Sequence, residues 1–162
     1  MTRAIRATLL ATALLLSIAL PAGAETTLIL DGHFREGFGG AASSDPCDSA
    51  PPFCGSGTVA GLGKATTLAF VDGTKTITLV SDDSTLVMHE TFVSSTTPGK
   101  STDAPGALLS YGNPYRLLVT WVADPALSTG IFAGFSGTGT TTVRAAGDVL
   151  IVDTHGTLTL AE

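Results

Sequence analysis

Two glutamates stand at strand-like positions where their same-face neighbours are apolar. Alternate residues of a β-strand face the same side, so Glu36 shares a face with Phe34, and Glu90 shares one with Phe92. The neighbours are Leu28, Leu30, Phe34 and Phe38 for Glu36, and Leu86, Met88 and Phe92 for Glu90. A buried carboxylate is costly unless it is neutral, paired or at a cavity. Such a carboxyl could bind the polar end of a ligand or act as a general acid or base.

Arg116 is the candidate partner for these carboxylates. It shares a strand face with Leu118, Thr120 and Val122, and Trp121 then lies on the opposite face. We therefore predict a ligand site formed by Glu36, Glu90, Arg116, Phe34 and Phe92. Aromatic walls around a few polar groups are typical of sites for small apolar molecules with one polar end. The alternative is structural, because Glu36 can reach water from a strand end, and one bulge inverts the face of every later residue.

Other catalytic and cofactor signatures are missing from the sequence. His33, His89 and His155 stand in no compact metal-ligand spacing, so we predict no metal site. The segment from Gly55 has alanine at the third glycine position of a dinucleotide-binding motif, and Gly63-Lys64 is not followed by Ser or Thr as a P-loop requires. We assign no catalytic residue and no cofactor.

The two cysteines, Cys47 and Cys54, lie in a segment rich in proline and small residues. Such a composition is typical of an ordered loop. In an exported protein a disulfide is the default state of a cysteine pair. A C-x6-C spacing matches neither a zinc site nor a C-x-x-C redox pair. We therefore predict a disulfide that stabilises the fold by roughly 2–3 kcal/mol in the chain-entropy model.

Residues 1–24 have the pattern of a secretory signal helix. Arg3 and Arg6 precede an apolar run from Leu9 to Leu20, and Ala22-Gly23-Ala24 is a small-residue cleavage site. Cleavage between Ala24 and Glu25 would leave one domain, residues 25–162, with a formal net charge of −8 instead of −6. We expect a secreted or periplasmic protein with no membrane association after removal of the signal. A retained N-terminal anchor is the alternative.

The remainder of the chain has short runs rich in Val, Ile, Leu, Thr and Phe, separated by Gly, Pro and Asp-Gly. This pattern indicates β-strands. The expected strands are Leu28–Gly37, Gly55–Leu62, Ala65–Val71, Lys75–Ser81, Thr85–Ser94, Tyr115–Ala123, Thr129–Ser136, Thr138–Ala145, Val149–Asp153 and Thr157–Leu160. Asp72-Gly73 and Asp82-Asp83 are turn candidates. One helical turn is expected at Ala126–Ser128, and Thr96–Gly106 is expected to be a loop.

The glycines favour a closed barrel over a sandwich. Gly55, Gly57, Gly61 and Gly63 share one parity, and Gly137 and Gly139 repeat the pattern. Glycine inside a strand often marks a bend or a close approach of another backbone, which small barrels need. We predict an all-β fold, a small closed antiparallel β-barrel of about eight strands with room for extra short ones. Loop glycines are the alternative explanation.

Three stretches of the chain resemble bacterial secreted members of the allene oxide cyclase barrel-like group, which includes the plant dirigent proteins. They are Cys54-Gly-Ser-Gly-Thr-Val-Ala-Gly-Leu-Gly-Lys-Ala-Thr, Ser128-Thr-Gly-Ile-Phe-Ala-Gly-Phe-Ser-Gly-Thr-Gly and the final Gly156-Thr-Leu-Thr-Leu. The resemblance implies an eight-stranded antiparallel barrel with a small apolar cavity. It implies no particular reaction, because activity in that group belongs to particular plant branches.

Charge and fold together narrow the function classes. The chain has 8 basic and 14 acidic residues, which argues against nucleic-acid binding, since that binding depends on basic surface. We expect a non-enzymatic protein that binds a small apolar ligand or serves an extracellular structural or interaction role. The alternative is a cyclase or isomerase that acts in the barrel with a buried glutamate. The sequence leaves a homo-oligomer open.

Overall fold

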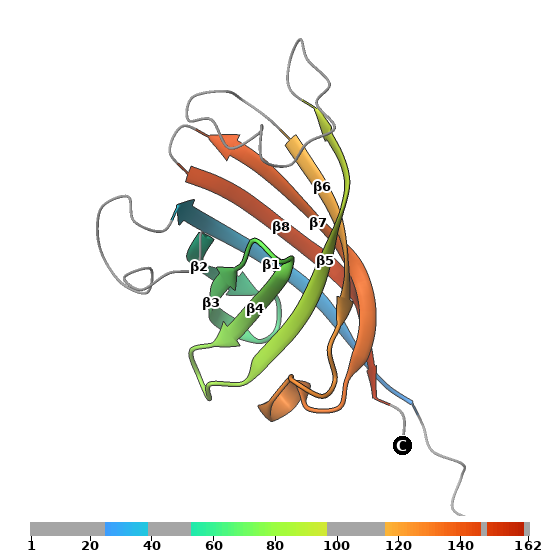
Figure 1. Cartoon of the computed structure of the whole chain (residues 1–162). Helices are drawn as coiled ribbons and strands as arrows, with labels where there is room; N and C mark the ends of the chain where they lie inside the picture. The colour runs from blue at the N-terminus through green and yellow to red at the C-terminus, as the bar shows by residue number, and fades with distance from the viewer. Residues whose placement is uncertain (1–24, 39–52, 97–115, 147–148, 161–162) are drawn as a thin grey trace, which may run out of the picture.

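The computed structural model describes residues 25–38, 53–96, 116–146 and 149–160, and these form a closed antiparallel barrel of eight strands (Figure 1). Each strand pairs with the next along the chain, and the last closes the barrel by pairing with the first. The strands are β1 (Thr26–Phe38), β2 (Phe53–Val59), β3 (Gly63–Ala69), β4 (Thr74–Leu79), β5 (Thr85–Thr96), β6 (Arg116–Ala123), β7 (Ser136–Ala146) and β8 (Val149–Leu160). The predicted all-β closed barrel is confirmed.

Three of the expected strands differ in the structure. Val149–Asp153 and Thr157–Leu160 are parts of the single strand β8, which runs without a break through Gly156. Thr129–Ser136 was predicted wrongly, because it contains the short 3-10 helix η2 (Gly130–Phe132) and turns. Gly130 and Gly134 adopt positive φ values of 61° and 78° there, which are incompatible with an extended strand.

Both predicted hairpin turns are present. The N–H of Gly73 donates to the carbonyl of Phe70, and Gly73 has a φ of 86°, so the Asp72-Gly73 turn joins β3 to β4. The second turn, which contains Asp82 and Asp83, joins β4 to β5, and Asp83 has a φ of 58°. An Asp at this position is one of the few non-glycine residues that tolerates a left-handed conformation.

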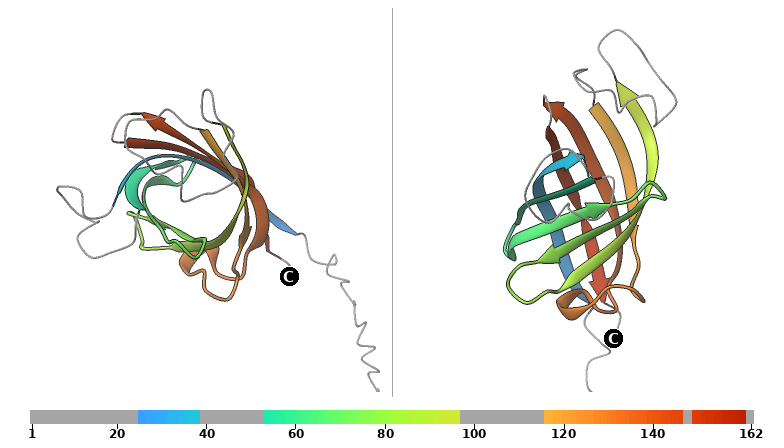
Figure 2. Two further views of the ribbon diagram at one scale, coloured as in Figure 1. Left: turned by 45° about the horizontal axis from the view of Figure 1, so that its top comes forward. Right: turned by 60° about the vertical axis from the view of Figure 1, so that its left-hand side comes forward.

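One end of the barrel is covered by the segment that links β6 to β7. Figures 1 and 2 show this segment, with η2, at the end where the two termini of the barrel also lie. Phe132 is fully buried and Phe135 nearly so, and both belong to the apolar core. The expected helical turn at Ala126–Ser128 is a single turn, in which the N–H of Ser128 donates to the carbonyl of Asp124 at 3.0 Å.

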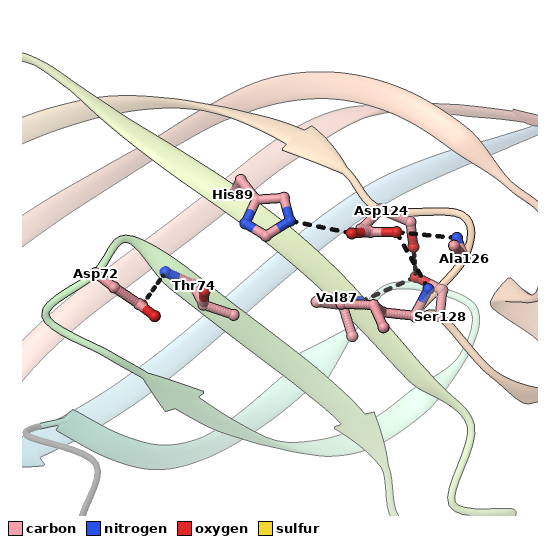
Figure 3. Close-up of polar contacts among 8 residues, drawn as sticks. Asp72, Thr74, Val87, His89, Asp124, Ala126 and Ser128 are labelled. Carbon is pink, nitrogen blue, oxygen red and sulfur yellow. Dashed lines mark hydrogen bonds and ion pairs between the residues drawn. The ribbon is translucent and has the colours of Figure 1, made fainter.

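The side chains of this closing segment fix it to the barrel wall. Asp124 Oδ1 accepts from the N–H groups of Ala126 and Leu127 at 2.9 and 3.1 Å, as an Asx turn does. Ser128 Oγ accepts from the N–H of Val87 at 3.0 Å (Figure 3). On η2, the N–H of Ile131 donates to Ser84 Oγ at 3.0 Å. The last two hydrogen bonds tie the segment to β5 and to the turn before it, and so hold Phe132 at this end of the barrel.

Glycines on the inner face make room for two large aromatic rings. A Cβ at Gly139 or Gly156, which oppose each other on β7 and β8, would overlap the indole of Trp121. A Cβ at Gly57 would overlap the ring of Phe34 in the same way. The expectation that Gly55, Gly57, Gly61 and Gly63 share one strand face holds only for the first two, since Gly61 and Gly63 flank the β2–β3 turn with positive φ.

Some expectations fall outside the described residues. These are the signal helix at residues 1–24 with its cleavage site before Glu25, the cysteine Cys47 and most of the Thr96–Gly106 loop. Cys54 is buried on β2, and its pairing with Cys47 stays a prediction. Among the described residues, no helix has the length and apolar character that crossing a membrane would require.

Candidate binding site in the barrel interior

A buried ion pair crosses the interior between β1 and β4. Lys75 Nζ lies 2.7 Å from Glu36 Oε1, and the residues are only 1% and 3% exposed. Gly55 stands opposite Glu36 on β2, and Ala69 stands opposite Lys75 on β3, so small residues lie beside both charged groups. A buried charge pair is weak evidence for stability, because desolvation offsets most of the attraction. Its position inside the barrel therefore suggests a role beyond holding the strands together.

Lys75 remains an ammonium in this setting. Burial favours the neutral amine, but attraction by Glu36 and Glu90, with the hydrogen bond to Glu36, outweighs burial and raises the pKa of Lys75. A lysine in this state is a donor and a fixed positive charge, and it is a poor nucleophile.

Glu90, on β5, is the third charged group of the interior. Its Oε1 atom is buried and has no hydrogen-bond partner among the residues that the structure describes. Burial raises the pKa of Glu90, and repulsion by Glu36 adds to the rise, while attraction by Lys75 and a hydrogen bond from Thr141 oppose it. Thr141 Oγ1 in turn lies 3.1 Å from Thr154 Oγ1, so a chain of hydroxyls leads from the carboxyl to β8. Glu90 thus retains its proton at higher pH than an ordinary glutamate.

In the described part of the chain, two other buried side-chain polar atoms have no hydrogen-bond partner. They are Trp121 Nε1 on β6 and Thr67 Oγ1 on β3. Both residues are at most 1% exposed and face the interior. Because an unsatisfied buried donor or acceptor costs about 1–3 kcal/mol, three such atoms from three strands call for an explanation. A bound molecule that supplies the missing hydrogen bonds is one.

The charged cluster, formed by Glu36, Lys75 and Glu90, lies toward the end of the barrel that the β6–β7 segment does not cover. The N–H of Glu90 donates to the carbonyl of Gly73 at 2.7 Å, which places Glu90 level with the β3–β4 turn. Beyond it, β5 continues from Thr91 to Thr96 and pairs with β6, whereas β4 begins only at Thr74, opposite His89, and does not extend to this level (Figure 1). Glu90 itself is partly exposed. The polar groups therefore lie near a rim of the barrel, and the plug of Phe132 lies at the other end.

The structure brings four of the five predicted site residues to the inner face and places the fifth outside. Phe34 and Glu36 are buried on β1, and Glu90 and Phe92 occupy inward positions of β5 by their pairing with Trp121 and Val119. The side chain of Arg116 is exposed, so the prediction that it faces the interior is wrong. Trp121, expected outside, is the inward residue of β6.

Sequence reasoning missed Lys75, although a signal for it was present. Lys75 has the same parity as Ile77 and Leu79, which are buried in the core. A lone lysine at the start of an apolar strand face is usually placed in solvent, since lysine is almost never fully buried unless paired. The partner, Glu36, is 39 residues away in the chain, and only strand pairing brings the two together.

The three histidines lie on the outer surface, each beside an aspartate. His89 Nε2 is 3.1 Å from Asp124 Oδ2 (Figure 3), His155 Nδ1 is 3.0 Å from Asp31 Oδ1, and His33 contacts Asp153. The hydrogen bond with His89 holds the pKa of Asp124 below its usual value. In the described part of the chain, no group of three His, Cys, Asp or Glu residues is arranged to hold a metal ion.

Comparison of the chain with models of known protein families, with curated proteins and with solved structures finds no match.

The raised pKa of Glu90 predicts a specific pH dependence of stability. The folded protein retains a proton that the unfolded chain releases near the ordinary glutamate pKa of 4.5. The free energy of unfolding therefore falls as pH rises from about that value through the pKa of the folded state. The Glu90→Gln variant lacks this loss. Urea unfolding of both proteins between pH 4 and pH 8 should show the variant gaining stability relative to the wild type as pH rises.

The exposed Glu25→Gln substitution is the control, because it removes the same charge outside the barrel. A stability difference between Glu90→Gln and the wild type that stays constant with pH would contradict the assignment of a raised pKa to Glu90.

Proposed function

We propose that this protein is an exported β-barrel that binds a small, largely apolar molecule in its interior, next to Glu36, Lys75 and Glu90. The observation that carries the proposal is a set of buried polar atoms on the inner face of the barrel that have no hydrogen-bond partner among the described residues: Glu90 Oε1, Trp121 Nε1 and Thr67 Oγ1. A few polar groups in an apolar enclosure are typical of sites for small molecules.

Two features from the sequence support the same proposal. The signal pattern of residues 1–24 and the Cys47–Cys54 pair fit a protein that works outside the cytoplasm. The resemblance to the allene oxide cyclase barrel-like group implies an eight-stranded antiparallel barrel, and the observed barrel has eight strands. Binding without catalysis is our first choice because no complete catalytic constellation surrounds Glu90 among the described residues.

Native mass spectrometry of the protein purified from its own source tests this proposal. We expect a complex heavier than the polypeptide under non-denaturing conditions, and the polypeptide mass alone after denaturation. Trp121 is the single tryptophan of the chain, so its fluorescence should change when the molecule is extracted and added back. A bare polypeptide mass, together with no fluorescence response to small apolar probes, would reject binding and leave a structural role.

An acid–base enzyme is the second candidate, and the raised pKa of Glu90 is the observation that favours it. A carboxyl that holds its proton at higher pH can donate it to a bound substrate and recover it in an isomerisation or cyclisation. An enzyme of this kind converts its ligand, so the ligand recovered after incubation would differ in structure from the one added. A binding protein returns the ligand unchanged.

A further inference from the structure

We propose that the polar end of the ligand is a neutral oxygen, a carbonyl or a hydroxyl, that accepts a hydrogen bond from Trp121 Nε1 beside the Glu90 carboxyl. This inference rests on the proposed function and names the chemical class that the same site would take. It depends on the positions of the Glu90 carboxyl and the Trp121 indole, on the net charge of Glu36, Lys75 and Glu90, and on the hydrogen bonds that Glu90 and Trp121 lack.

The Glu90 carboxyl and the Trp121 indole end side by side. The two residues oppose each other on β5 and β6, both on the inner face. The carboxyl reaches Thr141 on β7, and the indole lies over Gly139, which stands two residues from Thr141 on the same strand and the same face. Inward positions two residues apart on a strand are about 7 Å apart. One small head group can therefore meet both side chains.

The charge of the cluster favours a neutral head group. Glu36 and Lys75 offset each other in a contact of 2.7 Å, and a Glu90 that carries its proton adds no charge. A carboxylate head group would place an uncompensated negative charge beside Glu36. An ammonium head group would lie in the same interior as the Lys75 ammonium. Either charged head group would lose its hydration on entering the barrel and would find no free partner of opposite charge there. Such a transfer is costly in free energy.

The missing hydrogen bonds select an acceptor. An indole N–H is a donor only, so Trp121 needs an acceptor, which an ammonium is not. Thr141 stabilises the charged form of the Glu90 carboxyl, and among the described residues Oε1 has no hydrogen-bond partner. When Oε1 carries the proton, it also donates. A single carbonyl or hydroxyl oxygen has two lone pairs and can accept from both groups.

Four probes of equal chain length test the head group: octan-2-one, octan-1-ol, octylamine and octane-1-sulfonate. Each is titrated into the full mature protein at pH 5, with calorimetry for affinity and Trp121 fluorescence for location. We expect the ketone and the alcohol to bind more tightly than both charged probes. Tighter binding of octylamine or octane-1-sulfonate would overturn the inference while leaving the binding function intact. Binding of none of the four would reject the proposed function and the inference with it.

The pH dependence separates the two neutral oxygens. Above the pKa of Glu90, the ionised carboxyl can still accept from an alcohol but can no longer donate to a ketone. Ketone affinity should therefore fall with rising pH by about fivefold, the effect of one hydrogen bond, and alcohol affinity should not. Glu90→Gln keeps a donor that does not titrate, so ketone binding to this variant should not change with pH. An equal pH dependence in the variant would count against the role of Glu90.

Trp121→Phe tests the indole donor. The variant keeps an aromatic ring but loses the N–H, and we expect about fivefold weaker binding of both neutral probes by calorimetry. Val122→Ala is the matched control on β6, because Val122 faces outward and its loss should leave affinity unchanged. Trp121→Phe with unchanged affinity for both probes would overturn the proposed contact.

Discussion

Lys75→Met is expected to destabilise the protein by about 3–5 kcal/mol, the usual cost of removing one partner of a buried ion pair. Lys75 is 1% exposed, and its ammonium lies 2.7 Å from Glu36. Methionine preserves most of the apolar stem that lysine packs into the barrel wall. The loss of stability therefore reports mainly on the removal of the positive charge. Equilibrium unfolding in urea at pH 7 measures it.

The reason for so large an effect is that two carboxyl groups depend on one ammonium. Lys75 contacts Glu36 directly and also attracts Glu90, which lowers the pKa of Glu90 from where burial alone would place it. Without Lys75, Glu36 is an unpaired carboxylate in an apolar interior.

A double variant and a surface control make the result specific. Glu36→Leu together with Lys75→Met replaces the pair by apolar side chains, and we expect it to recover most of the lost stability. Lys64→Met is the control, because Lys64 is exposed on the neighbouring strand β3, and a change within about 0.5 kcal/mol is expected. A Lys75→Met variant as stable as Lys64→Met would contradict the description of Lys75 and Glu36 as a buried ion pair.

The sequence predicted those parts of the interior where a strand has one apolar and one polar face. In β1, the exposed Asp31, His33 and Arg35 alternate with buried residues, so the inward direction of Glu36 could be read directly. The outward side chains of His33 and Asp31 contact Asp153 and His155 of β8, which agrees with the same alternation. Here the pattern and the structure follow from one cause, which is that charged groups stay in water.

The same reasoning failed on β6 because both faces of that strand carry apolar residues. Leu118 and Val122 alternate with Val119 and Trp121, so polarity does not decide which set is inside. The strand pairing does, because Trp121 and Val119 oppose the inward residues Glu90 and Phe92 of β5. Arg116 consequently lies outside, and the lysine that pairs with Glu36 comes from another strand.

Long-range packing also explains why the expectation of two strands at residues 149–160 was wrong. Gly156 interrupts the apolar pattern, and locally a glycine favours a break. In the structure its missing side chain makes room for Trp121, which reaches across from β6 over Gly139 and Gly156. No local property of residues 149–160 contains this information, because the ring that needs the space stands about 35 positions earlier in the chain.

Phe132→Ala is the second substitution with a large expected effect, a destabilisation of about 3–5 kcal/mol. Phe132 is completely buried and belongs to the apolar core, although it lies on a three-residue helix in a connecting segment. Its ring closes the barrel at the end opposite Glu90. Truncation leaves a void that the surrounding strands cannot fill, because the closed ladder of hydrogen bonds fixes their spacing. Urea unfolding at pH 7 measures the loss.

Ile131→Ala is the matched control, since Ile131 precedes Phe132 on the same short helix but is 43% exposed. We expect it to change the free energy of unfolding by about 0.5 kcal/mol or less. The Phe132→Ala variant also tests whether the end of the barrel at Phe132 affects the site at Glu90. If Phe132 only closes the far end, Phe132→Ala should lower stability while the folded variant still shows the Glu90-dependent pH effect on octan-2-one binding. A variant that loses this effect while folded would show that the plug also shapes the site.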